Sequence, residues 1–232
     1  MLNRLFPADC LLCGMATHSA LNLCQACTHS LPRSNRPCLH CGIELEIDVE
    51  SKTCGGCSRA RPVYNNCIPA FSYAAPVSKL IGQFKFNGDF AAGAALAHLL
   101  GSAFTAHYLT RKAPDLIIAV PLHRSRLQAR GFNQSLEIAK VIHRMSGIPL
   151  AKHALARVKN TKPQTEIEGA KLRKRNLKGA FNYHQETPMT GNHHIALVDD
   201  VITTGATVSE AARALFLGGA NQVDCFCVAR AN

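Results

Sequence analysis

Short apolar runs alternate with longer segments in which apolar residues recur at helical spacing. The short runs predict strands over residues 70–73, 114–120, 150–158, 176–183, 195–198 and 222–229. The periodic segments predict helices that begin near residues 74–77, 89 and 133, and another helix that follows residue 207. Strands that alternate with helices are typical of the α/β class, so we expect a doubly wound parallel sheet.

The apolar run 195–198 ends in two adjacent carboxylates, Asp199 and Asp200, and a hydroxyl-rich loop leads from them into the next helix. This loop contains Thr203, Thr204, Gly205, Ala206 and Thr207. The unpaired N–H groups at the start of a helix suit a phosphate group, and a glycine lets the backbone approach it. The carboxylates can accept hydrogen bonds from vicinal hydroxyls. The stretch therefore predicts a site for a phosphorylated ribose; the plainer alternative is a strand–turn–helix in which Thr207 is only an N-cap.

A basic loop follows the strand predicted over 114–120. It carries His123, Arg124, Arg126 and Arg130 before the helix that begins near residue 133. Ligands of doubly wound proteins bind outside the carboxyl ends of the strands, so we expect this loop to lie beside the acidic pair. A basic loop that faces a phosphate-binding loop is suited to a pyrophosphate group.

Four CxxC pairs occupy the first quarter of the chain. They are Cys10 and Cys13, Cys24 and Cys27, Cys38 and Cys41, and Cys54 and Cys57. One pair can present two thiolates to a metal ion through a tight turn, and two pairs complete a tetrahedral zinc site. We expect the first pair to join the second and the third to join the fourth, giving two structural zinc sites. An interleaved arrangement and redox or disulfide chemistry are the alternatives.

The length of 232 residues allows a small accessory module, which we place at 1–62, and one α/β domain, which we place at 63–232. We see no signal peptide or membrane-spanning run, and we expect a cytoplasmic protein, in which disulfides are disfavoured. The net charge of +11 is concentrated, because residues 121–178 hold 14 basic and 3 acidic side chains. This excess predicts a polyanionic partner, although a solvated basic face has the same composition.

Two resemblances follow from these motifs. The run 195–207 resembles, without gaps, the phosphoribosyl pyrophosphate (PRPP) signature of type I phosphoribosyltransferases. The CxxC pairs, the segments 121–124, 130–134 and 162–164, and the acidic pair with its loop together resemble the ComF family of bacterial competence proteins, including its GntX-like members. This resemblance covers essentially the whole chain. It implies a double zinc ribbon joined to a type I phosphoribosyltransferase-like domain, and a role in natural transformation, where imported single-stranded DNA is handled in the cytoplasm.

Three functions are compatible with this resemblance. In the first, the protein is an active phosphoribosyltransferase of unknown acceptor, in which Leu122, His123 and Arg124 hold pyrophosphate with Mg²⁺. The hypoxanthine/guanine enzymes carry a carboxylate base where this chain has Thr203. In the second, which we favour, the domain binds PRPP without turnover and the protein binds single-stranded DNA. In the third, the zinc ribbon docks on a helicase-like motor and the basic face is incidental.

For single-stranded DNA we expect basic side chains on and around the segment 159–175 to neutralise backbone phosphates. They are Arg126, Arg130, Lys159, Lys162, Lys171, Arg173, Lys174 and Arg175. Only Phe132 and Phe181 accompany them, so base stacking should contribute little and binding should depend steeply on salt. Residues 159–172 are expected to form a mobile loop that could close over the ligand.

Overall fold

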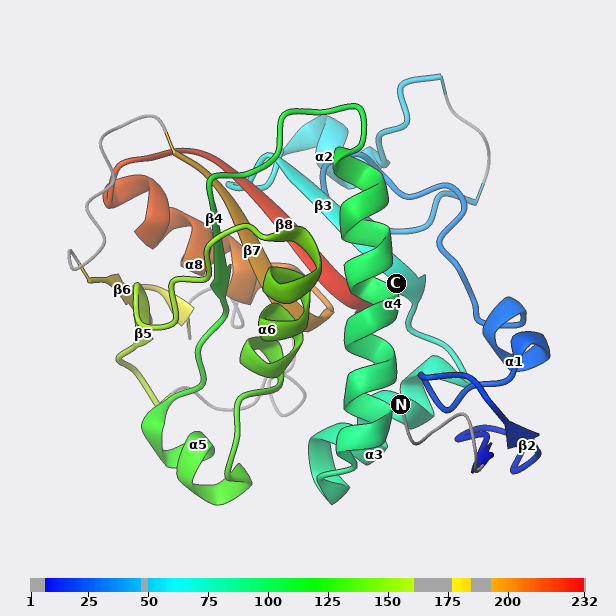
Figure 1. Cartoon of the computed structure of the whole chain (residues 1–232). Coiled ribbons are helices and arrows are strands. Elements are labelled where there is room, and N and C mark those ends of the chain that lie inside the picture. Colours follow the sequence, from blue (N-terminus) through cyan, green and yellow to red (C-terminus); the bar gives the residue numbers. More distant parts are fainter. Residues whose placement is uncertain (1–6, 47–49, 161–176, 185–192, 232) are drawn as a thin grey trace.

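A four-stranded parallel sheet forms the centre of the computed structural model, which describes residues 7–46, 50–160, 177–184 and 193–231 (Figure 1). Its strands, in spatial order, are β3 (Asn66–Ser72), β8 (Ala220–Arg230), β7 (His193–Ile202) and β4 (Leu116–Ala119). In the two central pairings Val198 of β7 lies opposite Ala119 of β4 and Phe226 of β8. The parallel α/β fold expected from the alternating pattern is confirmed.

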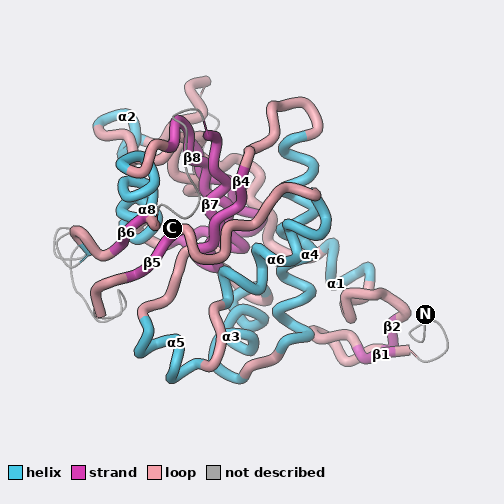
Figure 2. Tube along the Cα trace, turned by 60° about the vertical axis from the view of Figure 1, so that its left-hand side comes forward, coloured by secondary structure: helices cyan, strands magenta, loops and turns pink. Residues whose placement is uncertain are grey.

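Helices cover both faces of this sheet, as Figure 2 shows with the strands lying between α8 on one side and α4 and α6 on the other. The helices are α3 (Val77–Asn87), α4 (Phe90–Tyr108), α6 (Gln134–Ser146) and α8 (Ala206–Leu217). Strand residues alternate between two cores: Val198 packs in the core with α4 and α6, whereas Leu197 packs in the core with α8. Because both faces are buried, the strands have nearly continuous apolar sequences.

The main helix boundaries follow local capping signals. Asp89 caps α4 by accepting hydrogen bonds from the N–H groups of Ala91 and Ala92, both at 3.0 Å. Asn133 caps α6 in the same way, and Gly147, with φ of 73°, ends that helix. These limits agree with the helices predicted from the sequence. None of the described helices is long and apolar enough to cross a membrane.

The basic stretch after β4 is not the continuous loop that the sequence predicted. Residues Arg124–Arg130 form a short helix, α5, whose N-cap is His123. Nδ1 of His123 accepts the N–H of Ser125 at 3.3 Å, and Gly131, with φ of 83°, closes the helix. The prediction was wrong because arginine, leucine, glutamine and alanine are all good helix formers, and a histidine N-cap is a weak sequence signal.

The strand expected over 150–158 is divided into two parts. Leu150 forms a single parallel bridge with Ile117, and β5 (Leu155–Arg157) pairs antiparallel with β6 (Phe181–Tyr183) in a separate small sheet. Bends at residues 152–154 separate the two parts. The expected loop 159–172 falls almost wholly outside the described residues, since residues 161–176 are not among them.

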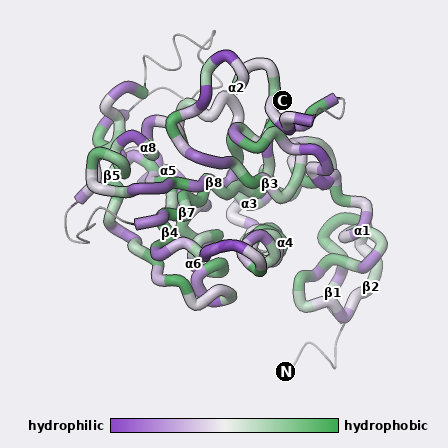
Figure 3. The backbone as a smooth tube through the Cα atoms, turned by 90° about the horizontal axis from the view of Figure 1, so that it is seen from above, coloured by the Kyte–Doolittle hydropathy of each residue, from purple (hydrophilic) through white to green (hydrophobic). Residues whose placement is uncertain are grey.

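The N-terminal segment contacts the α/β domain at two places. Its first half contains β1 (Ala8–Asp9), β2 (Ala16–Thr17) and α1 (Gln25–His29), and buried Leu23 packs against Ala95 of α4. Figures 1 and 3 show this half to the side of the molecule, next to α4. The second half, which includes α2 (Gly55–Arg59), packs against β3: a Cβ on Gly42 would lie 2.9 Å from Sγ of Cys67.

Candidate functional site

The carboxyl ends of β4 and β7 form a topological switch point of the sheet. These two strands are neighbours, yet the helix α6 that follows β4 covers one face and the helix α8 that follows β7 covers the other. The chain therefore leaves the carboxyl ends of these two neighbouring strands toward opposite faces of the sheet. In doubly wound folds a ligand-binding crevice lies at this position. The acidic pair and the basic stretch are both located here.

Asp199 and Asp200 lie near the end of β7 and are buried, with exposed fractions of 8% and 9%. Oδ1 of Asp199 accepts hydrogen bonds from Oγ of Ser135 and from the backbone N–H of Asp200, each at 2.9 Å. Oδ2 of Asp200 accepts from Nζ of Lys85 at 2.8 Å, forming an ion pair. Residues from three separate elements thus hold the two carboxylates.

The two carboxyl groups differ in charge because their partners differ. Burial and, to a smaller extent, the neighbouring Asp200 raise the pKa of Asp199 to about 7, although the bond from Ser135 opposes the shift. Burial acts in the same direction on Asp200, but the charge of Lys85 outweighs it and leaves the pKa of Asp200 below its ordinary value. Near neutral pH, Asp200 is therefore ionised, while Asp199 can exchange a proton and act as donor or acceptor.

The threonine loop leads directly into α8. Gly205 is the N-cap of this helix, with φ of 73°, and Oγ1 of Thr204 accepts the N–H of Ala206 at 3.4 Å. Thr207 is accordingly not the N-cap, so this detail of the plainer alternative is wrong. A Cβ on Gly205 would lie 3.0 Å from Oη of the buried Tyr64, so both space and backbone conformation require glycine.

A small hollow beside this loop extends to Asp199 and has a volume of about 20 Å³. That is room for about one water molecule and not for a phosphate group. Thr203 and Thr204, by contrast, are exposed. A phosphorylated ligand would therefore lie over the exposed threonines and the start of α8, where N–H groups and the helix dipole favour an anion.

On the other side of the switch point, the residues after β4 are only partly available to a ligand. Nδ1 of His123 is occupied as the α5 cap, whereas Arg124 is exposed and Leu122 is half-buried. The side-chain amide of Asn133 donates to the backbone carbonyl of Val120 at 3.1 Å, which fixes the start of the segment. The backbone of 122–124 and the Arg124 side chain are thus the groups best placed for an anionic ligand.

The expected DNA-binding side chains separate into three groups. Arg126 and Arg130 line one cavity of about 560 Å³ together with Lys85. Lys159 does not line this cavity, and its Nζ donates to the carbonyl of Lys178 at 2.7 Å. The remaining expected residues, Lys162, Lys171, Arg173, Lys174 and Arg175, lie outside the described residues.

Ser135 and Arg230 were not identified from the sequence. The guanidinium of Arg230 is buried and donates from Nε to the carbonyl of Cys41 at 2.8 Å. Its Nη1 donates to the carbonyl of Ile202 at 3.2 Å and to that of Thr203. Arg230 thereby connects the threonine loop to the cysteine-rich segment, and no local sequence pattern signals a contact across such a separation.

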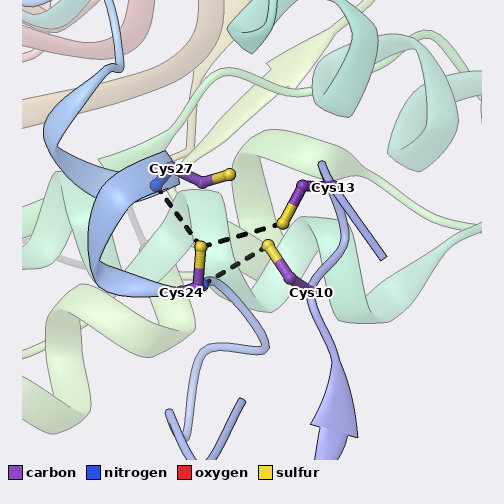
Figure 4. Close-up of side chains that lie close together, drawn as sticks. All are labelled: Cys10, Cys13, Cys24 and Cys27. Atoms are coloured by element: carbon purple, nitrogen blue, oxygen red, sulfur yellow. Dashed lines mark hydrogen bonds between the residues drawn. The ribbon is translucent and has the colours of Figure 1, made fainter. Parts of the chain in front are cut away.

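The first four cysteines form one compact cluster. Figure 4 shows the side chains of Cys10, Cys13, Cys24 and Cys27 pointing toward a common centre. The sulfur atoms of Cys13 and Cys24 are 3.8 Å apart. Tetrahedral zinc, with Zn–S distances of about 2.3 Å, requires sulfur atoms about 3.8 Å from one another.

The other four cysteines, Cys38, Cys41, Cys54 and Cys57, form an equivalent cluster, in which the sulfur atoms of Cys41 and Cys54 are 3.6 Å apart. The predicted pairing of the CxxC units, first with second and third with fourth, is confirmed. Although burial opposes it, N–H donors lower the pKa of Cys10 to about 6 and that of Cys38 to about 7, which favours the thiolate form that binds metal.

Comparison with known proteins agrees with these observations. Residues 1–58 match the family model of the double zinc ribbon domain, so the two four-cysteine clusters are zinc-binding sites. The chain is also 35% identical over 231 residues to Competence protein F of Haemophilus influenzae, a match that covers 97% of this chain and 98% of the relative. The chain belongs to the ComF family.

Other members of the ComF family match over a similar length. DNA utilization protein YhgH of Escherichia coli is 35% identical over 227 residues, with 97% of each chain covered. Competence protein ComFC of Streptococcus pneumoniae is 24% identical over 236 residues, covering 95% of this chain and 99% of the relative. These matches span both the cysteine-rich segment and the α/β domain of this chain, and the relatives' names connect the ComF family with competence and DNA utilization.

Among solved structures, the Bacillus subtilis glutamine PRPP amidotransferase complexed with ADP and GMP matches 59% of this chain and 26% of its own, with 20% identity and a TM-score of 0.39. The purine phosphoribosyltransferase of Pyrococcus horikoshii matches 60% of this chain and 82% of its own, with 17% identity and a TM-score of 0.34.

Proposed function

We propose that this ComF-family protein binds PRPP or a related phosphorylated ribose with Mg²⁺ at the switch point, and binds single-stranded DNA through its basic segment during cytoplasmic handling of imported DNA. The observation that carries the first part is the buried Asp199–Asp200 pair beside the start of α8. Hydroxyl-binding carboxylates and a phosphate-binding helix start meet there, which is the combination that a phosphoribose ligand requires.

Each part of the ligand then has a defined partner. The ribose hydroxyls donate to Asp199 and Asp200, and the 5-phosphate lies over the loop 203–207. The segment 122–124 and Mg²⁺ hold the pyrophosphate group. Lys85 Nζ now supplies the positive charge at Asp200, at 2.8 Å, so ligand hydroxyls or a hydrated Mg²⁺ would take over some of its role.

The DNA-binding part rests on charge and on the relatives. Competence and DNA utilization, the functions in the relatives' names, both involve DNA, and residues 121–178 carry 14 basic side chains against 3 acidic ones. A segment of this kind attracts a nucleic acid backbone and releases its counterions. The zinc ribbon stays the predicted contact for a helicase-like partner.

The ligand site is tested by isothermal titration of PRPP with Mg²⁺ into the wild-type protein and into Asp200→Asn. The wild type should release binding heat, and the variant should lose at least about 10-fold in affinity, since a hydrogen bond to a charged group contributes roughly 1.5–3 kcal/mol. Asp115→Asn is the matched control, because Asp115 directly precedes β4 and lies at the amino end of this strand, whereas the site lies at the carboxyl end. An absence of heat from the wild type would remove this part of the proposal.

A further inference from the structure

A group of aromatic and cationic side chains lies on the surface close to the acidic pair. This aromatic-cationic patch consists of Lys85, Phe86, Phe90, Arg126, Arg130 and Phe132. Phe86 is 75% exposed and Phe90 is 57% exposed. Large apolar side chains that are exposed to water on the same surface of a folded protein commonly mark a binding surface.

A defined turn and packing between rings position the aromatic side chains of the patch. Gly88, with φ of 65°, ends α3 and Asp89 caps α4, so the turn that carries Phe86 and Phe90 is defined at both ends. The ring centroids of Phe90 and Phe132 are 4.9 Å apart, and buried Phe84 lies beneath them, 5.1 Å from Phe132. Phe90 and Phe132 therefore form a preformed aromatic platform, and Phe86 lines the same cavity as Phe132. Preformed rings lower the entropic cost of binding a flat group.

Positive charge surrounds this platform. The guanidinium of Arg130 lies 5.8 Å from the centre of the Phe86 ring, and Arg126 lines the same cavity of about 560 Å³. None of the residues that line this cavity is acidic. Lys85 lines it as well and bonds to Asp200 at 2.8 Å, so the patch is continuous with the proposed ribose site.

We propose that this patch is a base-stacking site for single-stranded DNA, in which a nucleobase packs on Phe86 while Arg126 and Arg130 hold the neighbouring phosphates. This inference rests on the proposed DNA-binding function, and it assigns the strand to this patch and its binding to base stacking. A cationic groove with exposed rings is the usual arrangement for binding single strands, whereas the bases of a duplex are stacked inside and cannot reach such rings.

The proposal revises the expectation that stacking contributes little. That expectation considered only the aromatic residues within the basic segment, whereas Phe86 and Phe90 come from α3 and α4, far earlier in the chain. A purely apolar protein surface is the less favoured occupant, because it would remove the charged guanidinium groups of Arg126 and Arg130 from water.

The test measures fluorescence anisotropy of a labelled oligo-dT strand, and of a strand of the same length with abasic residues, across a salt series. Phe86→Ala should weaken oligo-dT binding by about 5- to 100-fold, the usual range for loss of one stacked base, and Phe86→Trp should restore it. Binding of the abasic strand and the slope of affinity against salt should change little. Leu109→Ala, which removes another exposed apolar side chain at the far end of α4, should leave oligo-dT binding unaltered.

Three other results would contradict the inference in distinguishable ways. If Phe86→Ala binds oligo-dT like the wild type, the patch does not stack bases and an apolar protein partner becomes its better occupant. If Phe86→Ala weakens both strands equally, the change acts on shape or folding, which PRPP titration of the same variant checks independently. If the wild type binds neither strand, the proposed DNA-binding function itself fails.

Discussion

At the scale of single residues, Asp199 and Asp200 show how neighbours in one strand acquire different chemistry. The two side chains meet different partners, because Asp199 accepts a hydrogen bond from Ser135 of α6, whereas Asp200 pairs with Lys85 of α3. A hydroxyl compensates a buried charge only partly, while an ammonium group does so strongly. The buried carboxyl of Asp199 is therefore maintained at a cost in stability, as is common for groups that serve a ligand.

The free energy of unfolding should reveal this cost. The pKa of Asp199 is about 7 in the folded protein and about 3.9 when unfolded, so the folded state binds the extra proton and stability falls as pH rises between these values. Asp199→Asn keeps the acceptor oxygen and removes the charge. Relative to the wild type, it should gain on the order of 4 kcal/mol by pH 8 and little near pH 4.

Urea unfolding followed at several pH values measures this difference. A gap between wild type and Asp199→Asn that does not widen as pH rises would show that Asp199 is ionised throughout. The same variant should bind PRPP less tightly, because one of the two carboxylates offered to the ribose is lost.

At the scale of elements, the two zinc-ribbon halves differ in how they are joined to the α/β domain. The first half packs on α4 through apolar residues such as Leu23. The second half is joined to the candidate site by Arg230, whose guanidinium donates both to the carbonyl of Cys41 and to the carbonyls of Ile202 and Thr203. Loss of the second zinc site should therefore disturb the threonine loop.

Matched substitutions of one cysteine in each cluster test this difference. Cys41→Ser and Cys13→Ser should each reduce the bound zinc from two ions per chain to one, measured by atomic emission. Cys41→Ser should also lower PRPP affinity about 10-fold, since a charge-assisted hydrogen bond contributes roughly 1.5–3 kcal/mol, while Cys13→Ser should not. Equal PRPP affinities in the two variants would show that the second site does not support the loop.

At the scale of the whole molecule, the features that could be predicted are those encoded within one short stretch. The run 195–207 contains a strand, an acidic pair and a glycine-dependent turn, and the CxxC spacing constrains two thiols directly. The pairing of Lys85 with Asp200, the bridge made by Arg230 and the meeting of Phe86 with Arg130 depend on tertiary packing between distant segments. Periodicity in a single sequence carries no information on such contacts.

The prediction of a continuous basic loop was wrong for a similar reason. Its composition predicted a polyanion-binding loop, but α5 (Arg124–Arg130) directs Arg130 toward Gln134 and the ring of Phe86. Charge was thus recognised correctly, whereas its placement depended on a cap at His123 and a turn at Gly131 that the hydrophobic pattern does not report.

A crystal structure of the protein with PRPP and Mg²⁺ would show whether the carboxyl ends of β4 and β7 bind a phosphoribose group. We expect the 5-phosphate over the loop 203–207, ribose hydroxyls on Asp199 and Asp200, and Lys85 moved away from Asp200. A ligand bound elsewhere, or crystals grown in excess PRPP in which Lys85 still pairs with Asp200 and the loop carries no phosphate, would contradict it.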